Sequence, residues 1–221
     1  MNVRVTRFLE GARTASGHTV IVDVFRAFTT AAFCVAAGAR EIVLVSDHEQ
    51  ALAMKRADPS LFLTGEIGGQ KIPGFDVGNS PSAIERLDLE GRRVVQRTSS
   101  GTQGVVAAWN AERILLVSFM IAEATIRHLA RTADVTLVAM GHGGSELSEE
   151  DEACAGYLAL RLGGARPDTA AIIAKLWEHV TQPWPEWFPR RDAELACQVD
   201  RFDFALPVTR EGGLLVARPA R

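Results

Sequence analysis

Residues 20–30, VIVDVFRAFTT, place charged and hydroxyl side chains directly after an apolar run. The β-branched residues 20–22 predict a strand buried on both faces of a sheet, and residues 27–37 predict a helix. Asp23 and Arg26 therefore fall at a strand-to-helix junction, where open α/β sheets bind ligands and helix N-termini attract anions. The carboxylate could hold a metal and the guanidinium a phosphate. Alternatively, the two side chains could form an internal ion pair that fixes the turn.

A second polar stretch, residues 64–81, combines five glycines and two prolines with Glu66, Lys71, Asp76 and Asn79. It is predicted to be one long loop. Loops of this length inside a compact domain are usually functional or disordered, and the interleaved apolar residues favour order.

A third stretch, RTSSGTQG at 97–104, is predicted to be a turn between a strand and a helix that begins at residue 105. Its small hydroxyl residues and glycines can donate N–H and O–H groups to phosphate oxygens. A simple serine-capped helix would explain the same residues. The lysine of a nucleotide P-loop is missing, which disfavours an ATP or GTP site.

Three consecutive carboxylates follow a glycine-rich turn, in GHGGSELSEED at 141–151. Ser148 and Asp151 have capping-box spacing, which predicts that Asp151 bonds back to the start of a helix. Asp151 also lies on the apolar stripe of that helix, which instead directs its carboxylate inward. Carboxylates grouped in this way could bind magnesium, a cation that takes oxygen ligands and keeps several waters.

Alternating apolar runs and helical patterns predict a three-layer α/β/α fold with a largely parallel or mixed sheet. The chain, 1–221, is expected to form a single domain, and glycine turns in both halves also suit two similar lobes that divide near 118–132 with the site between them. Strands are predicted at 3–5, 20–22, 41–45, 61–63, 92–96, 113–117, 135–140, 202–206 and 213–217. Helices are predicted at 27–37, 48–56, 105–110, 122–131, 168–180 and 190–198, and after the caps at Ser80 and Ser148.

Composition limits the class of protein. The 221 residues are 47% hydrophobic with a net charge of -3, and no basic stripe favours nucleic acid as a partner. The three cysteines are widely spaced among apolar residues, which predicts reduced core thiols. No signal segment or membrane span is visible, so a soluble, cytoplasmic protein is expected.

An aromatic, proline-rich segment occupies residues 181–191, TQPWPEWFPRR. Its first interpretation is a rigid loop that packs aromatic rings on the core; a substrate lid or a dimer contact is the second. Among the scattered histidines, His142 in the glycine turn is the one placed to meet a substrate.

Four stretches, in this order over most of the chain, resemble the magnesium-dependent 2-phosphosulfolactate phosphatases, the ComB family: VIVDVFRAFTT followed by AAGA, GEIGGQKIPGFDVGNSP, TSSGT and LSEEDEACAG. The second block is the most specific because it is long and unusual. The resemblance implies a ComB-like α/β fold, a Mg²⁺ requirement and hydrolysis of a phosphate monoester of a small acidic hydroxy acid. In that family the substrate feeds coenzyme M biosynthesis.

Matched position by position, the resemblance implies three groups of site residues. Catalysis is assigned to Asp23, Arg26, Glu66 and Lys71; substrate or phosphate binding to Thr29, Thr30, Asp76, Asn79, Ser80, Ser99, Ser100, Gly101 and Thr102; and Mg²⁺ binding to Asp23, Glu150 and Asp151. The chain also departs from the family. Ser99–Thr102 read SSGT where the family usually has TNGT, and Phe25 and Phe28 are bulkier than usual. These departures predict that the phosphate and metal chemistry is kept while the organic part of the substrate has changed.

The expected reaction is metal-assisted phosphoryl transfer to water. Asp23 is favoured as a metal ligand or base over a covalent nucleophile, because the haloacid dehalogenase pattern needs an aspartate at position 25, which is Phe25. Two alternatives stay open: a phosphatase for another small phosphorylated metabolite in a specialised pathway, and a non-catalytic phosphometabolite-binding protein. The expected partner is a small phosphate ester, with no nucleic acid or membrane, and a homodimer is left open.

Overall fold

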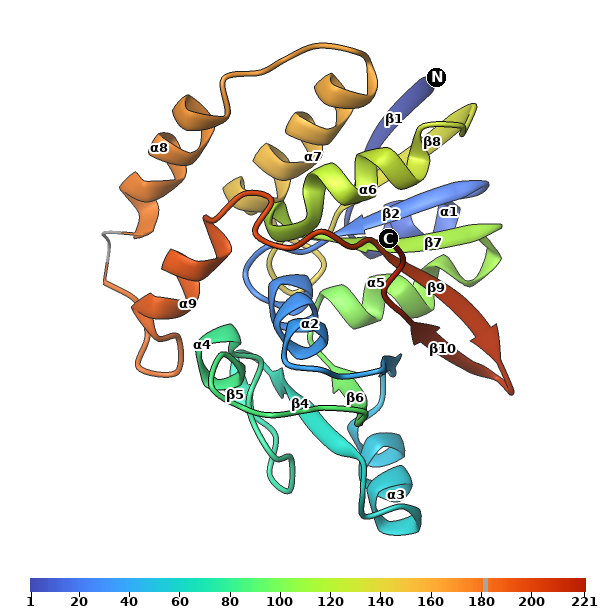
Figure 1. Ribbon diagram of the computed structural model, residues 1–221, viewed down its shortest axis with the longest axis vertical. Coiled ribbons are helices and arrows are strands. Elements are labelled where there is room, and N and C mark those ends of the chain that lie inside the picture. The colour runs from blue at the N-terminus through green and yellow to red at the C-terminus, as the bar shows by residue number, and fades with distance from the viewer. Residues whose placement is uncertain (181–182) are drawn as a thin grey trace.

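In the computed structural model, which describes residues 1–180 and 183–221, the described strands form one ten-stranded sheet with helices on both faces (Figure 1). The strand order is β1-β8-β2-β7-β9-β10-β3-β6-β4-β5. The three-layer α/β/α prediction is therefore confirmed. The strands are β1 Asn2–Arg7, β2 His18–Val22, β3 Glu41–Leu44, β4 Phe62–Ile67, β5 Gln70–Lys71, β6 Arg93–Arg97, β7 Arg113–Val117, β8 Asp134–Ala139, β9 Leu206–Glu211 and β10 Leu214–Ala217.

The described helices form the two outer layers. Helices α1 and α5 pack together, and α6, α7, α8, α9, α4 and α2 contact one another in that order (Figure 1). Their bounds are α1 Phe8–Thr14, α2 Ala27–Ala36, α3 His48–Ala57, α4 Pro81–Ile84, α5 Gly101–Ala107, α6 Ala122–Leu129, α7 Glu149–Leu162, α8 Thr169–Val180 and α9 Arg190–Ala196, with short 3-10 turns at Ala108–Asn110 and Phe119–Ile121.

The sheet consists of two parallel groups joined by an antiparallel hairpin. Strands β1, β8, β2 and β7 are parallel to one another, as are β3, β6 and β4. The hairpin β9–β10 pairs with β7 on one side and β3 on the other. The first group draws strands from both sides of residues 118–132, so the proposed boundary does not separate the two groups. Whether the chain behaves as two lobes stays a prediction.

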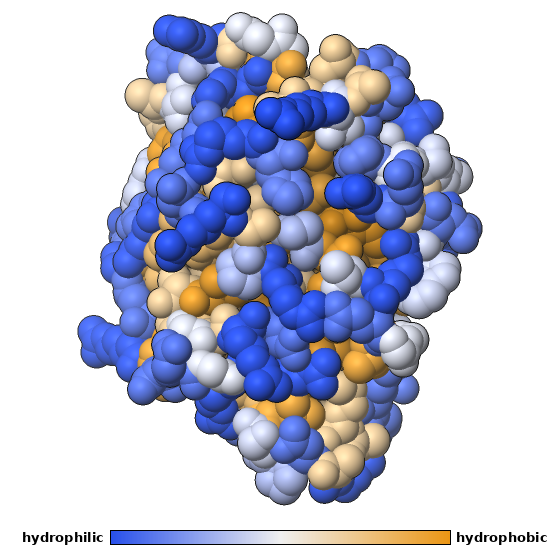
Figure 2. Space-filling view, turned by 45° about the vertical axis from the view of Figure 1, so that its right-hand side comes forward, coloured by the Kyte–Doolittle hydropathy of each residue, from blue (hydrophilic) through white to orange (hydrophobic). Residues whose placement is uncertain are grey.

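The burial of β2 on both faces of the sheet explains its continuous apolar sequence. Strand β2 lies between β7 and β8, and Val20, Ile21 and Val22 are fully buried, as expected for a strand covered on both faces. The face in Figure 2 is largely hydrophilic, with hydrophobic atoms visible between polar side chains. All three cysteines are buried and unpaired, and no helix in the described ranges is long and apolar enough to cross a bilayer.

Two predicted helix caps are confirmed, whereas Ser148 stands at the N-cap position of α7 without a side-chain cap hydrogen bond. Asp47 caps α3 by accepting a hydrogen bond from the Glu49 N–H, and Ser80 caps α4, which has Pro81 at its first position. Each cap satisfies a backbone donor that the helix itself leaves unpaired.

Three predicted boundaries were wrong. The 64–81 loop is shorter than expected, because β4 continues to Ile67 and turns into β5. Helix α5 begins at Gly101, four residues before the predicted start at residue 105. The small residues that were predicted to form a turn therefore form the first turn of the helix. The last hairpin begins at Leu206, whereas residues 202–205 are not in a strand and the Phe202 and Phe204 rings stack on each other.

Candidate active site

A pocket of about 580 Å³ opens where β2, β4, β6 and β8 end. Its wall includes seven of the residues singled out from the sequence: Asp23, Arg26, Glu66, Asn79, Ser99, Ser100 and Glu150. His142 also lines it. The structure therefore brings together side chains that are far apart in the sequence.

Asp23 and Asp151 fix the floor of this pocket. Asp23 follows β2 directly, is 4% exposed, and accepts the N–H of Ala27 at 2.9 Å. Asp151 is 2% exposed, which confirms the inward direction expected from the apolar stripe of its helix. Its carboxylate accepts the N–H of Val24 at 2.7 Å and that of Gly141 at 2.8 Å. Asp151 thus ties α7 to the ends of β2 and β8.

Burial and mutual repulsion raise the pKa values of three carboxyl groups here. Burial, with Asp151 and Glu66 nearby, raises the pKa of Asp23 well above its usual range. Burial and then Glu150 raise the pKa of Asp151 to about 8. Burial, together with Asp23, raises the pKa of Glu150 to about 7. Buried carboxyl groups that repel one another hold protons unless a cation compensates their charge.

The donor set fits Mg²⁺. Asp23 and Glu150 present carboxylates to the pocket, and the buried Asn79 offers a side-chain oxygen that has no hydrogen-bond partner among the described residues. Within those residues no three Asp, Glu, His or Cys side chains form a ready metal cluster. Mg²⁺ often needs only one or two carboxylates because it keeps several waters. Asp151 fits a supporting position better than a direct ligand, because each of its oxygens already accepts a backbone N–H.

Glu66 and the short link between β6 and α5 hold each other in place. Glu66 Oε1 accepts the N–H of Ser99 at 2.5 Å, while Oε2 accepts the Ser99 hydroxyl at 2.9 Å and the Gly69 N–H at 2.7 Å. Ser100 is the N-cap residue of α5, but its hydroxyl donates to the Gly141 carbonyl at 2.7 Å. Ser100 therefore joins two of the turns around the pocket, and the simple serine-cap explanation is wrong.

Arg26 forms a buried ion pair, but its partner is not Asp23. Its Nη1 donates to Asp192 Oδ2 at 2.8 Å, and the two side chains are 4% and 0% exposed. The guanidinium carbon also lies 4.2 Å from the centre of the Phe188 ring. The alternative expectation of an Asp23–Arg26 ion pair is therefore wrong, and Arg26 instead links the end of β2 to a helix near the C-terminus.

Asp192 is the residue that sequence reasoning missed. Its second oxygen accepts the Ser80 hydroxyl and the Ser82 N–H, each at 2.9 Å. It connects the start of α4 to Arg26, which it follows by 166 residues in the sequence. Asp192 sits in the charged run RRDAEL, which reads as a solvated helix face, so nothing local marks it as buried.

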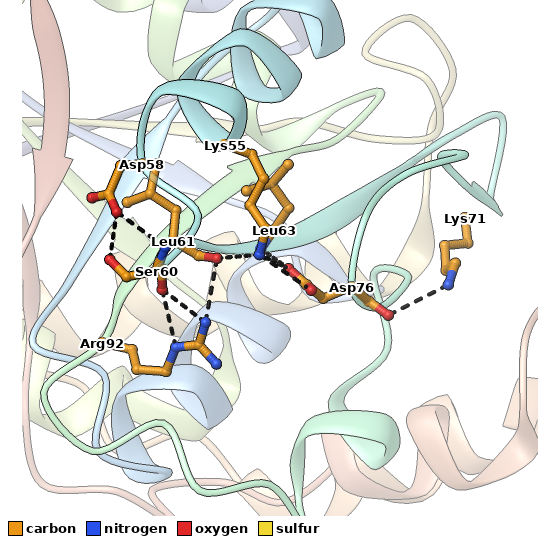
Figure 3. A network of polar contacts seen from close by, with 8 residues as sticks. All are labelled: Lys55, Asp58, Ser60, Leu61, Leu63, Lys71, Asp76 and Arg92. Atoms are coloured by element: carbon orange, nitrogen blue, oxygen red, sulfur yellow. Dashed lines mark hydrogen bonds and ion pairs between the residues drawn. The ribbon is translucent and has the colours of Figure 1, made fainter.

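Lys71 and Asp76 do not line the pocket and belong instead to a network of polar contacts beside β4 (Figure 3). Asp76 accepts the Leu63 N–H at 2.7 Å and pairs with Lys55 at 3.1 Å. Lys71 is exposed and its ammonium donates to the Asp76 carbonyl at 3.4 Å. Both side chains are used to brace the turn after β4.

Five other predicted residues also lie behind the lining. Thr29 donates to the Val24 carbonyl at 2.8 Å, and Thr102 exchanges hydrogen bonds with Thr98 across the turn. Gly101 packs against Asp23. Five predicted residues therefore support the wall of the pocket and do not line it: Thr29, Thr30, Ser80, Gly101 and Thr102.

Aromatic side chains form the outer wall. Trp184, Trp187 and Phe188 from the proline-rich segment line the pocket beside Phe25. The rings pack on one another and on the core, as the first interpretation expected, whereas the lid or dimer contact stays a prediction. Residues 181 and 182 of this segment lie outside the described residues.

A larger hollow of about 690 Å³ lies at the opposite, amino ends of β2 and β7. It is lined by residues such as His18, Arg113 and Arg210 and contains none of the predicted carboxylates. The smaller pocket is therefore the candidate active site.

Comparison with known proteins agrees with the resemblance. A family model described as 2-phosphosulpholactate phosphatase matches residues 6–194. Probable 2-phosphosulfolactate phosphatases of Thermus thermophilus and Deinococcus radiodurans are 41% and 38% identical to this chain over 162 and 161 residues. Each match covers 70% of this chain and 67% of the relative. A Bacillus subtilis protein of the same name is 33% identical over 156 residues, or 69% of this chain and 67% of its own.

Proposed function

This chain belongs to the 2-phosphosulpholactate phosphatase family, and from that membership we propose that it uses Mg²⁺ to hydrolyse 2-phosphosulfolactate or a related ester of a small acidic hydroxy compound. The family makes the chain a phosphoric monoester hydrolase. The metal requirement and the identity of the ester are the parts proposed here.

The pocket's buried carboxylates support the proposal most directly. Asp23 and Glu150 line it, Asp151 supports them from behind, and burial raises the pKa of all three. A site that holds uncompensated acidic groups together is poised for a divalent cation, and such groups are clustered at functional sites. When bound, Mg²⁺ would supply charge neutralisation for the phosphate and a template for the attacking water.

The residues of the chain would perform the remaining steps. Arg26, oriented by Asp192, would bind phosphate oxygens through N–H groups not used in that ion pair. Asp23 would accept a proton from water or hold the metal that activates it. Water adds to phosphorus and the bond from phosphorus to the alcohol oxygen breaks, which gives inorganic phosphate and the hydroxy acid.

Phosphate release from 2-phosphosulfolactate tests this function. We expect release with Mg²⁺ and little release in EDTA, and we expect Asp23→Asn to lower kcat by about 10²-fold or more in folded protein, the scale of losing a positioned acid or base. Asp203→Asn is the matched control, because the Asp203 side chain is 86% exposed and absent from the pocket lining.

Full activity in EDTA would remove the metal from the proposal. Binding of 2-phosphosulfolactate without release of phosphate from any ester would favour the non-catalytic phosphometabolite-binding protein. Release only from other esters would favour the alternative phosphatase.

A further inference from the structure

Two exposed apolar side chains, from segments far apart in the sequence, line the pocket. Among the described residues, Leu147 and Trp187 belong to the few large hydrophobic side chains that are exposed, at 67% and 37%, and both line this pocket. Leu147 comes from the glycine turn after β8, and Trp187 from the segment before α9. Exposed apolar side chains that meet at a pocket are typical of a ligand-binding surface.

The aromatic side of this mouth is held firmly. The Trp184 and Phe188 rings stack with centres 4.3 Å apart, and Phe25 meets them edge-on at 5.8 and 5.9 Å. Trp187 lies directly against Gly69, where an added Cβ would come within 2.2 Å of the indole. Because these side chains are already ordered, an apolar ligand can pack on them without a further loss of side-chain entropy.

The charge of the lining does not suit a sulfonate. Among the lining residues that the structure describes, Arg26 and His142 are the side chains that can carry positive charge. Arg26 is already paired with Asp192, and the other ionisable side chains of the lining, Asp23, Glu66 and Glu150, are acidic. A Mg²⁺ ion would serve the phosphate, so a sulfonate at C3 of the substrate would face mainly apolar and acidic groups.

We propose that the natural ester carries an apolar group of about the size of an aromatic ring, which packs between Leu147 and the Trp187 indole. This inference rests on the proposed phosphatase function. Leu147, Trp187 and the ring behind them, Phe188, are the specificity-determining residues.

Three esters that share one skeleton test the proposal. The phosphate esters of lactate, 3-phenyllactate and 3-sulfolactate, in the same configuration at C2, keep the phosphate and carboxylate and differ only in hydrogen, phenyl or sulfonate at C3. We expect kcat/KM to be roughly 10- to 100-fold higher for the phenyl ester than for the other two, the range over which apolar pockets discriminate small groups.

Two variants locate the preference. Leu147→Ala and Trp187→Ala should each lower the ratio of kcat/KM for the phenyl ester over the lactate ester by about tenfold. Leu160→Ala and Trp109→Ala are matched controls, since these side chains are 50% and 46% exposed and lie outside the pocket. The controls should leave the ratio unchanged.

The outcomes separate this inference from the function on which it rests. Hydrolysis of all three esters without preference for phenyl, or with preference for sulfonate, overturns the inference and leaves the phosphatase intact. If neither these three esters nor any other tested phosphate ester is hydrolysed, the proposed function itself is overturned. An unchanged phenyl preference in both Leu147→Ala and Trp187→Ala places the apolar subsite elsewhere and also overturns the inference.

Discussion

At the scale of single residues, the position of Arg26 depends on a carboxylate that follows it by 166 residues. We expect Asp192→Asn to lower the free energy of unfolding by about 3–5 kcal/mol, because it leaves a buried guanidinium without a counter-charge. The same change should raise KM for phosphate esters, since Arg26 would no longer be held toward the pocket. Chemical denaturation and steady-state kinetics measure the two effects.

Asp203→Asn provides the comparison for that variant. It breaks an ion pair with Arg127 in which both side chains are more than half exposed, and such pairs contribute at most about 1 kcal/mol. Equal losses of stability in the two variants would show that the Arg26–Asp192 pair is no more important than a surface pair.

The raised pKa values predict how stability depends on pH without metal. Asp151 and Glu150 keep their protons to about pH 8 and 7 in the folded chain, whereas the unfolded chain releases them near pH 4. The folded state binds more protons in this window, so the free energy of unfolding falls as pH rises through it. In EDTA, Tm should therefore be lower at pH 8.5 than at pH 6, by about 2–4 °C for each kcal/mol lost.

Magnesium should reverse this loss, because the cation takes the place of the protons. The rise in Tm caused by Mg²⁺ should be larger at pH 8.5 than at pH 6. Asp151→Asn, which cannot ionise, should weaken the pH dependence measured in EDTA. An identical Mg²⁺ effect at both pH values would contradict the compensation of these carboxylates by the cation.

The sequence was informative about this site where a residue directly follows a strand. Asp23, Ser99 and Ser100 could be placed in one pocket because the ends of strands converge. Lys71 and Asp76 could not be separated from it, since a motif shows which residues are shared with a family but not which way each side chain points. The burial of Asp192 depends on tertiary packing alone.

At the scale of elements, the first turn of α5 packs tightly on Asp23. A methyl group at position 101 would lie 2.7 Å from Ala27 Cβ and 2.8 Å from Asp23 Oδ2, closer than such atoms approach. We expect Gly101→Ala to destabilise the chain by about 1–3 kcal/mol through overpacking and to lower kcat by at least about tenfold through displacement of Asp23. Thermal unfolding and phosphate release would measure both.

Gly156→Ala is the control for that change. Gly156 lies inside α7, and an added Cβ would have no atom within 4 Å beyond its chain neighbours and the backbone of its own helix. There the same substitution should stabilise the chain by about 0.5–1 kcal/mol, because alanine favours a helix interior over glycine. A Gly101→Ala protein with normal kcat would show that α5 can shift without moving Asp23.

The start of α5 also shows why element boundaries were hard to predict. Ser99, Ser100 and Gly101 have turn propensities, and the helix begins among them because Glu66 and Gly141 take their hydrogen bonds. Tertiary partners of this kind override local propensity.

At the scale of the whole molecule, the β9–β10 hairpin joins the two parallel groups of the sheet. Val216 is fully buried in β10, so we expect Val216→Asp to abolish cooperative unfolding by placing an unpaired charge in the core.

A two-residue insertion between Gly212 and Gly213, at the exposed turn, is the control. It should lower the free energy of unfolding by less than about 1 kcal/mol because short loop extensions are tolerated. Circular dichroism on heating distinguishes the two.

A fully folded Val216→Asp protein would show that the two parallel groups do not need the hairpin. Alternation of strands and helices predicted the layers of this fold, but it could not show the hairpin's place. A strand's partner is decided by pairing across the sheet, and β9 lies beside β7 although about ninety residues of sequence separate them.

The β9–β10 hairpin is synthesised last, although it joins the two parallel groups of the sheet. Strands β7 and β3 each keep one unpaired edge until residues 206–217 have left the ribosome, because those residues supply both partners. An open strand edge pairs readily with other chains. Several nascent chains on one messenger RNA would thus be able to pair with one another late in translation. Slow translation of the last strands should therefore increase aggregation more than slow translation of the first strands.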